Sequence, residues 1–121
     1  MGTVKVWVGA TVAGNSGQVN DDRRVVEFDG EELAERTEYG AGRAGGITDT
    51  RGITETLYRA ADGRLIVHVR DWSHWQGEPT VETLHEVNEA DLGPTGRFSQ
   101  IGYEAGFGRP LTLDEALPAK G

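Results

Sequence analysis

Cysteine is absent from this chain of 121 residues. Its absence excludes a disulfide framework, a thiolate nucleophile and a zinc site built on cysteines. Long apolar runs are missing too, because no stretch approaches the roughly 20 apolar residues that a membrane span needs. The start, MGTVKVWVGAT, lacks the charged region and the apolar core of a signal peptide. We therefore expect a cytoplasmic protein that does not contact a membrane.

Positive charge is scarce, because the chain has 12 Lys and Arg residues but 20 Asp and Glu residues, which gives a net charge of −8. A charge of this sign repels a phosphate backbone and argues against direct binding of nucleic acid, so a basic protein surface is the expected partner. An acidic surface also keeps many proteins soluble, and the charge alone does not choose between these roles. The length fits a single domain, residues 1–121.

Alternation of apolar and polar residues is the main structural signal that the chain does carry. It predicts strands at residues 3–11, 23–28 and 81–87 and on both sides of Asp62-Gly63. The first of the Asp-Gly pairs, Asp29-Gly30, predicts a tight reversal of the chain.

The rest of the chain divides into one ambiguous segment and a helical end. Residues 31–39 fit either a short helix or a strand, and their alternation favours the strand. Capping residues predict short helical turns after Asn88 and over 110–117. The expected fold is α+β: an antiparallel β-meander of about five or six strands, with one or two short C-terminal helices packed on one face.

The pair Asp62-Gly63 gives the strongest hairpin signal in the sequence. If these two residues form the whole loop, Leu57 lies opposite His68 and Glu55 lies opposite Arg70, where the charges attract. Both faces of this hairpin then carry apolar side chains, which predicts a central place in the sheet.

Signatures of catalysis are weak. Residues 40–45 match GxGxxG, but the β-branched residues that follow predict a strand, whereas a dinucleotide site needs a helix there. No spacing indicates a nucleophile with its base, so we expect no catalytic residue and no cofactor, and a non-enzymatic role is favoured. The alternative is a small metal-dependent enzyme or ligand-binding protein, whose candidate ligands are Asp71, His74, Glu78 and His85.

The stretch DWSHWQGE, residues 71–78, holds two of the three tryptophans. We expect Trp72 to lie in the core, whereas Trp75 either folds back over the sheet edge or stands at a contact surface. Because binding residues gather in loops carried by a rigid sheet, we expect the partner-binding residues to be those in the connections. These are Tyr39, Arg43, Trp75, Glu78, Glu86, Glu89 and Asp91.

The segment LYRAADGRLIVHVRDWSHWQGE, residues 57–78, with the strand after it, resembles small bacterial domains of the EXLDI type. Their pattern is an LYR…GR hairpin, a turn that contains Trp, and another strand, and the resemblance covers about residues 25–92. It implies a meander and no assigned activity. In size, acidity and lack of cysteine the chain is also similar to phage or mobile-element proteins that block host defence, anti-CRISPR proteins among them. We therefore expect a non-enzymatic protein-binding module that inhibits a host defence protein or a nucleic-acid-binding protein.

Overall fold

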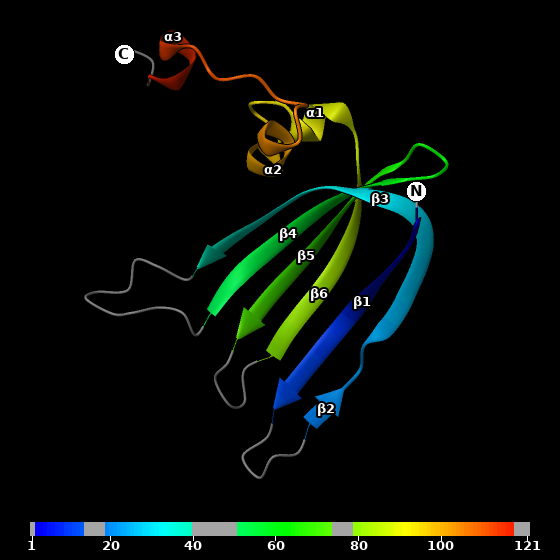
Figure 1. Cartoon of the computed structure of the whole chain (residues 1–121). Coiled ribbons are helices and arrows are strands. Elements are labelled where there is room, and N and C mark those ends of the chain that lie inside the picture. The colour runs from blue at the N-terminus through cyan, green and yellow to red at the C-terminus, as the bar shows by residue number, and fades with distance from the viewer. Residues whose placement is uncertain (1, 14–18, 40–50, 74–78, 118–121) are drawn as a thin grey trace, which may run out of the picture.

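The computed structural model describes residues 2–13, 19–39, 51–73 and 79–117. These residues form an antiparallel sheet and short helices, which confirms the α+β class (Figure 1). The strands are β1 (Gly2–Ala13), β2 (Val19–Asp21), β3 (Arg24–Tyr39), β4 (Arg51–Ala60), β5 (Leu65–Ser73) and β6 (Pro79–Val87). The helices are α1 (Glu89–Leu92), α2 (Ser99–Glu104) and α3 (Leu113–Ala116). None of these helices has the length or the apolar character to span a lipid bilayer.

Strands that follow one another in the chain lie side by side, as in a meander, and the sheet then closes on itself. The order is β2-β1-β3-β4-β5-β6, and β1 also pairs with β6 through residues 9–12. β2 continues the register of β3 along β1, so the two act as one interrupted strand. The sequence predicted the antiparallel sheet but not this closure, because no local pattern shows which distant strand β1 will meet.

The predicted reversal at Asp29-Gly30 is wrong. β3 continues through Gly30, where it changes partner from β1 to β4. A Cβ at this position would lie 2.6 Å from the carbonyl oxygen of Arg59. Gly30 therefore permits a close approach of two backbones rather than a turn, and the strand expected for residues 31–39 is confirmed as the second half of β3.

The predicted register of the β4–β5 hairpin is also wrong, by one residue. The loop has three residues, since the amide of Ala60 donates to the oxygen of Arg64, and Gly63 takes the left-handed conformation with φ +94°. His68 consequently lies opposite Thr56, and Leu57 lies opposite Val67. The expected pairing of Glu55 with Arg70 is lost with that register. The central position of the hairpin, between β3 and β6, is confirmed.

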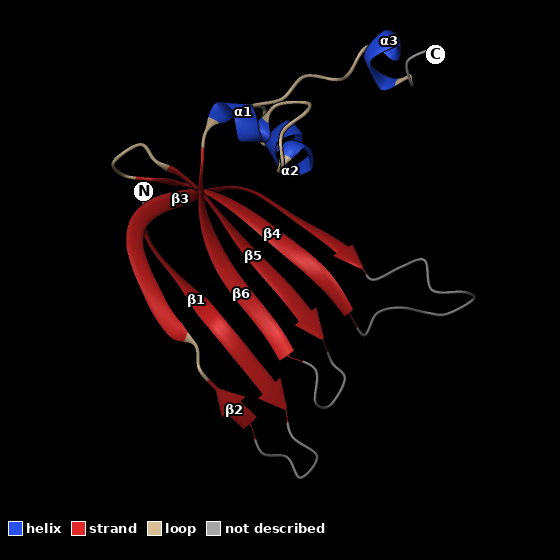
Figure 2. Cartoon of the chain, turned by 180° about the vertical axis from the view of Figure 1, so that it is seen from behind, coloured by secondary structure: helices blue, strands red, loops and turns tan. Residues whose placement is uncertain are grey.

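The helices α1 and α2 lie at one end of the sheet (Figure 2), and their apolar side chains pack against its outer face. Leu57 and Val67 on that face meet Leu92 of α1 and Ile101 of α2, and all four side chains are fully buried. Asn88 caps α1 as expected. The described residues form three short helices where one or two were expected, and α3 stands apart from the other two (Figure 1).

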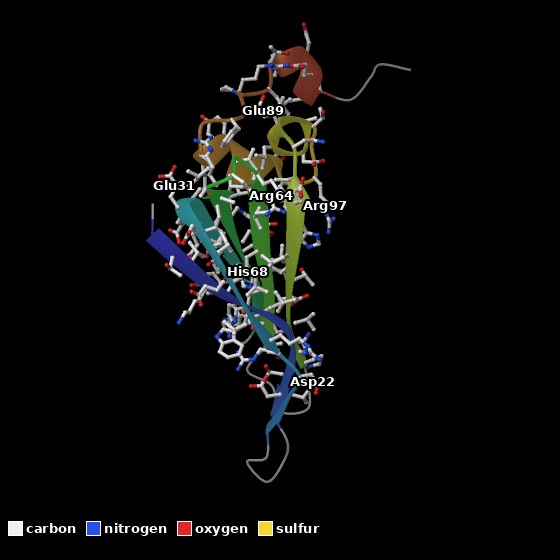
Figure 3. All side chains as sticks on the ribbon, turned by 90° about the vertical axis from the view of Figure 1, so that its right-hand side faces the viewer. Asp22, Glu31, Arg64, His68, Glu89 and Arg97 are labelled. Carbon is white, nitrogen blue, oxygen red and sulfur yellow. The ribbon has the colours of Figure 1, made fainter. Side chains whose placement is uncertain are left out.

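The inner face of the same strands is covered by the hairpin of β1 and the first half of β3. Phe28 on this hairpin meets Tyr58 on β4 edge to face, with ring centroids 5.6 Å apart. Figure 3 shows β1 crossing the sheet at the level of His68. Three polar residues are buried here, Thr56, His68 and Glu82. Trp72, expected in the core, is buried as well. Its partners differ from those expected, because the shifted register places it opposite Gly52 and on the face away from Leu57.

Candidate functional site

Three of the partner-binding residues expected from the sequence, Arg43, Trp75 and Glu78, lie outside the described residues, as does the expected metal ligand His74. Both alternatives for Trp75, a residue at a contact surface or one folded back over the sheet edge, therefore stay predictions.

The four described members of that set do not form one surface. Tyr39 is exposed at the end of β3, opposite Gly52, and its ring contacts Trp72 edge to face. Glu86 lies across β5 from Tyr58 of β4, because both residues pair with Ile66. Tyr58 is six residues from Gly52, the partner of Tyr39, which corresponds to about 20 Å along the strand.

Two acidic members of the set lie in α1, near Glu86. Glu89 is exposed, but Asp91 has a structural role, because its carboxylate accepts from the amide of Asn88 while its own amide donates to the Asn88 side chain. Asp91 is therefore part of a capping box and is not spare for a partner.

The described members of the expected metal site are far apart. Asp71 lies opposite Val81, four residues along β6 from His85, which corresponds to about 13 Å. His85 packs on Phe98 and its Nε2 lies 2.9 Å from the hydroxyl of Thr83. Burial and the nearby positive charge of Arg97 lower the pKa of His85. Within the described ranges no three His, Asp or Glu side chains are grouped as metal ligands.

A second group of titratable side chains, Arg23, His68 and Glu82, lies where β1 begins to pair with β6, at Gly9 and Glu82. We call this junction of β1 and β6 the seam. Nε2 of His68 is 2.8 Å from the carbonyl oxygen of Trp7 and 3.4 Å from a carboxylate oxygen of Glu82. The other carboxylate oxygen is 3.5 Å from the guanidinium of Arg23. His68 and Glu82 are only 8% and 4% exposed. Because the imidazole and the carboxylate are both buried and the imidazole is bonded to the backbone of β1, this group joins the strands at the seam rather than facing a substrate.

The outward face of the β1–β3 hairpin is a better candidate for contact. Trp7 is 45% exposed although it sits in mid-strand, and it lies opposite Val25, which is also exposed. The guanidinium of Arg23 stacks 4.9 Å from the Trp7 ring and is held there by two bonds to Asp21 of 2.9 and 3.0 Å. The hydrogen bonds from Arg23 lower the pKa of Asp21 to about 2. Trp7 is thus a large, positioned aromatic surface that is open to solvent.

Carboxylates continue the same face along β3. Alternation places Glu27, Asp29 and Glu31 on the side of Val25, and all three are exposed. We call these three residues the acidic row; Figure 3 labels Glu31, its last member. Their side chains form no ion pair with any described residue. Neighbours in the row are two residues apart, about 7 Å along the strand.

Sequence reasoning missed this face, although part of the signal was present. The alternation of Val4, Val6 and Val8 leaves Trp7 on the opposite side of its strand, and a Trp outside the apolar stripe is a sign of a contact surface. The acidic row was not recognised because the predicted reversal at Asp29-Gly30 divided it between two strands.

Comparison of the chain with models of protein families, with curated proteins and with solved structures found no match.

Proposed function

We propose that the protein is a non-enzymatic binding module that presents the outward face of its β1–β3 hairpin to a basic protein surface. The observation that supports this most directly is the acidic row, three exposed carboxylates without ion-pair partners among the described residues, beside the exposed Trp7. Unpaired surface carboxylates attract a positive partner over a distance, and an aromatic residue supplies apolar contact area once the two surfaces meet.

The class of partner that fits this face best is a nucleic-acid-binding protein. Such proteins hold phosphates with rows of Lys and Arg side chains. A line of carboxylates repeating every 7 Å or so along a strand presents negative charge to those side chains in a similar way. Occupation of that surface excludes the nucleic acid, and the protein then acts as an inhibitor of the kind expected for a phage or a mobile element.

The test begins with capture of proteins from host lysate at low salt, followed by kinetics of the captured partner on immobilised protein. Neutralising the acidic row (Glu27→Gln, Asp29→Asn, Glu31→Gln) is expected to slow association by roughly tenfold, an effect that high salt removes. The control variant is Glu86→Gln, Glu89→Gln, Glu104→Gln, which changes the net charge equally at exposed sites away from the hairpin. Equal slowing by both variants would mean that net charge alone acts, and the proposed face would be wrong.

The aromatic part of the face is tested separately. Trp7→Ala is expected to speed dissociation by roughly tenfold or more, with a smaller change in association, because the contact forms after encounter. Tyr39→Ala, which removes an exposed aromatic at the end of β3, is the matched control. Loss of binding in the Tyr39 variant with normal binding in the Trp7 variant would move the site to the other side of the molecule.

A further inference from the structure

The second half of β3 has a neighbouring strand on one side only. At Gly30 the strand has two neighbours, Gly2 of β1 on one side and Ala60 of β4 on the other. Beyond Gly30, β3 pairs with β4 alone among the described strands. In Figure 1 this half of β3 forms the border of the sheet beside β4. Such a border leaves backbone N–H and C=O groups open to pairing with a further strand.

The pairing of β4 shows which of its backbone groups face β3. The amide of Ala60 donates to the oxygen of Arg64, so Ala60 directs its backbone groups toward β5. Successive residues of a strand direct these groups to opposite sides, and the odd-numbered residues of β4 therefore direct theirs toward β3. Those that lie past the bulge of β3 are Leu57, Glu55 and Ile53.

The outward groups of β3 follow from this alternation. Ala34, Arg36 and Glu38 pair with the three β4 residues just named, so their backbone groups face β4. The residues that alternate with them direct their N–H and C=O groups away from the sheet, where no described strand pairs with them. These residues are Glu35, Thr37 and Tyr39. We call residues 35–39 the free edge.

Side-chain contacts hold the free edge in its extended form. The hydroxyls of Thr37 and Thr54 are 3.1 Å apart, which ties the middle of the edge to β4. The ring of Tyr39 meets the ring of Trp72 on β5 edge to face, with centroids 6.0 Å apart. An added strand thus meets an edge that is already in place, which lowers the entropic cost of pairing.

The charges beside the free edge favour a basic occupant. Glu31, Glu32 and Glu35 are exposed and form no ion pair with any described residue. The base among them, Arg36, already forms ion pairs with two other glutamates. Pairing with the same edge of a second copy adds further carboxylates and is opposed by repulsion, whereas Lys and Arg side chains on an added strand are attracted.

We infer that an extended, basic segment of a partner protein adds to the free edge as a further strand, antiparallel to β3. The added strand lies in line with β1, which pairs antiparallel with the same side of β3 up to Gly30. Backbone hydrogen bonds supply the affinity, and basic side chains at alternate positions supply the specificity. This inference goes beyond the proposed function and does not rest on it, because it uses backbone groups past Gly30 rather than side chains of the β1–β3 hairpin.

Amide hydrogen exchange of the full chain, measured by NMR with a synthetic seven-residue peptide that alternates Lys and Thr, tests the inference. In the free protein the amides of Glu35, Thr37 and Tyr39 are expected to exchange faster than those of Arg36 and Glu38. Saturating peptide is expected to slow the first three by roughly tenfold or more, because each N–H gains an acceptor. A peptide of the same length that alternates Glu and Thr is expected to leave them unchanged.

Thr37→Pro tests the same contact from the side of the protein. Proline lacks the N–H, and its ring obstructs an added strand, so peptide binding is expected to weaken by roughly tenfold or more. The N–H of Thr37 faces away from β4, so the pairing of β3 with β4 is kept. The control Thr37→Ala loses the contact with Thr54 but keeps the N–H, and it is expected to bind the peptide as the wild type does.

A Lys–Thr peptide that is N-methylated on alternate residues makes the matching test without altering the protein, and it is expected to lose binding. Equal binding of this peptide, or equal binding by the Thr37→Pro and Thr37→Ala variants, overturns the inference, because charge rather than strand pairing then holds the peptide. Slow exchange at all three outward amides in the free protein overturns it too, since the edge is then already covered. Absence of binding at millimolar Lys–Thr peptide overturns it equally and leaves the proposed function standing.

Discussion

The two faces of the β4–β5 hairpin, whose side chains alternate along the same two strands, are stabilised in different ways. On the outer face Leu57 and Val67 are fully buried beneath α1 and α2. On the inner face, one position along each strand, Thr56 and His68 are buried beneath the β1–β3 hairpin. The outer layer gains its free energy mainly from removing apolar surface from water, whereas the inner layer buries polar atoms beside apolar side chains such as Trp72, and each buried polar atom requires a partner.

The inner layer meets this requirement through contacts between distant segments. The hydroxyl of Thr56 donates to Glu35, and Nε2 of His68 meets the carbonyl of Trp7. Such bonds add little net stability but are costly to leave unmade. We infer that these polar contacts of the inner layer fix the position of β1 on the sheet more than they add to stability.

The largest expected effect is in the outer layer. Leu57→Ala is expected to lower the free energy of unfolding by about 2–5 kcal/mol, because it removes a fully buried side chain and leaves a cavity. Urea denaturation measures the change. Leu113→Ala is the matched control, since the same substitution at a 74% exposed position should cost less than about 0.5 kcal/mol. A loss below 1 kcal/mol for Leu57→Ala would show that α1 and α2 do not form the main core.

The next effect is in the inner layer and is smaller. His68→Ala leaves the carbonyl of Trp7 without its donor and is expected to cost about 1–3 kcal/mol in the same assay. His68→Gln, whose amide can donate from a similar reach, should recover part of that loss. Equal losses for the two variants would mean that a hydrogen-bond donor at this position contributes nothing to stability, and the contrast between the layers would disappear.

Sequence reasoning located the elements better than it located their pairing. The turn at Asp62-Gly63 is where the pattern predicted it, but the dipeptide occurs both in two-residue loops and, with Gly in the left-handed conformation, in three-residue loops. One extra residue in the loop exchanges the faces of β5 relative to β4. The apolar pattern did not reveal the error, because Leu57 and His68 each sit on a face that is buried.

The seam and the candidate site depend on contacts between residues that are far apart in the sequence. His68 meets Trp7 across 61 positions, and no local pattern encodes that distance. The capping box at Asn88 and Asp91 is local, and its position was predicted, although the same reasoning also assigned Asp91 to a binding surface. A residue three positions after a cap is better interpreted as part of the cap.

The smallest effect concerns the C-terminal arm, residues 109–117, which belongs to neither layer. Side-chain hydrogen bonds from Arg109, followed by the backbone bond from Thr112, lower the pKa of Glu115 from 4.5 to about 2. Because the pKa is lower in the folded arm, the stabilising contribution of this carboxylate is fully present above about pH 4.5 and is lost as the pH falls through about 2. We expect α3 to lose its cap in that window without unfolding of the sheet.

NMR titration of the Glu115 side chain and amide measures this. In the control variant Arg109→Gln the guanidinium bonds are gone, and Glu115 should titrate closer to its ordinary range. Signals from β4 and β5 should not follow the Glu115 transition in the wild type. If they do, the arm is coupled to the sheet, and the separation of the molecule into an apolar outer layer, a mixed inner layer and an arm held only by its own bonds is wrong.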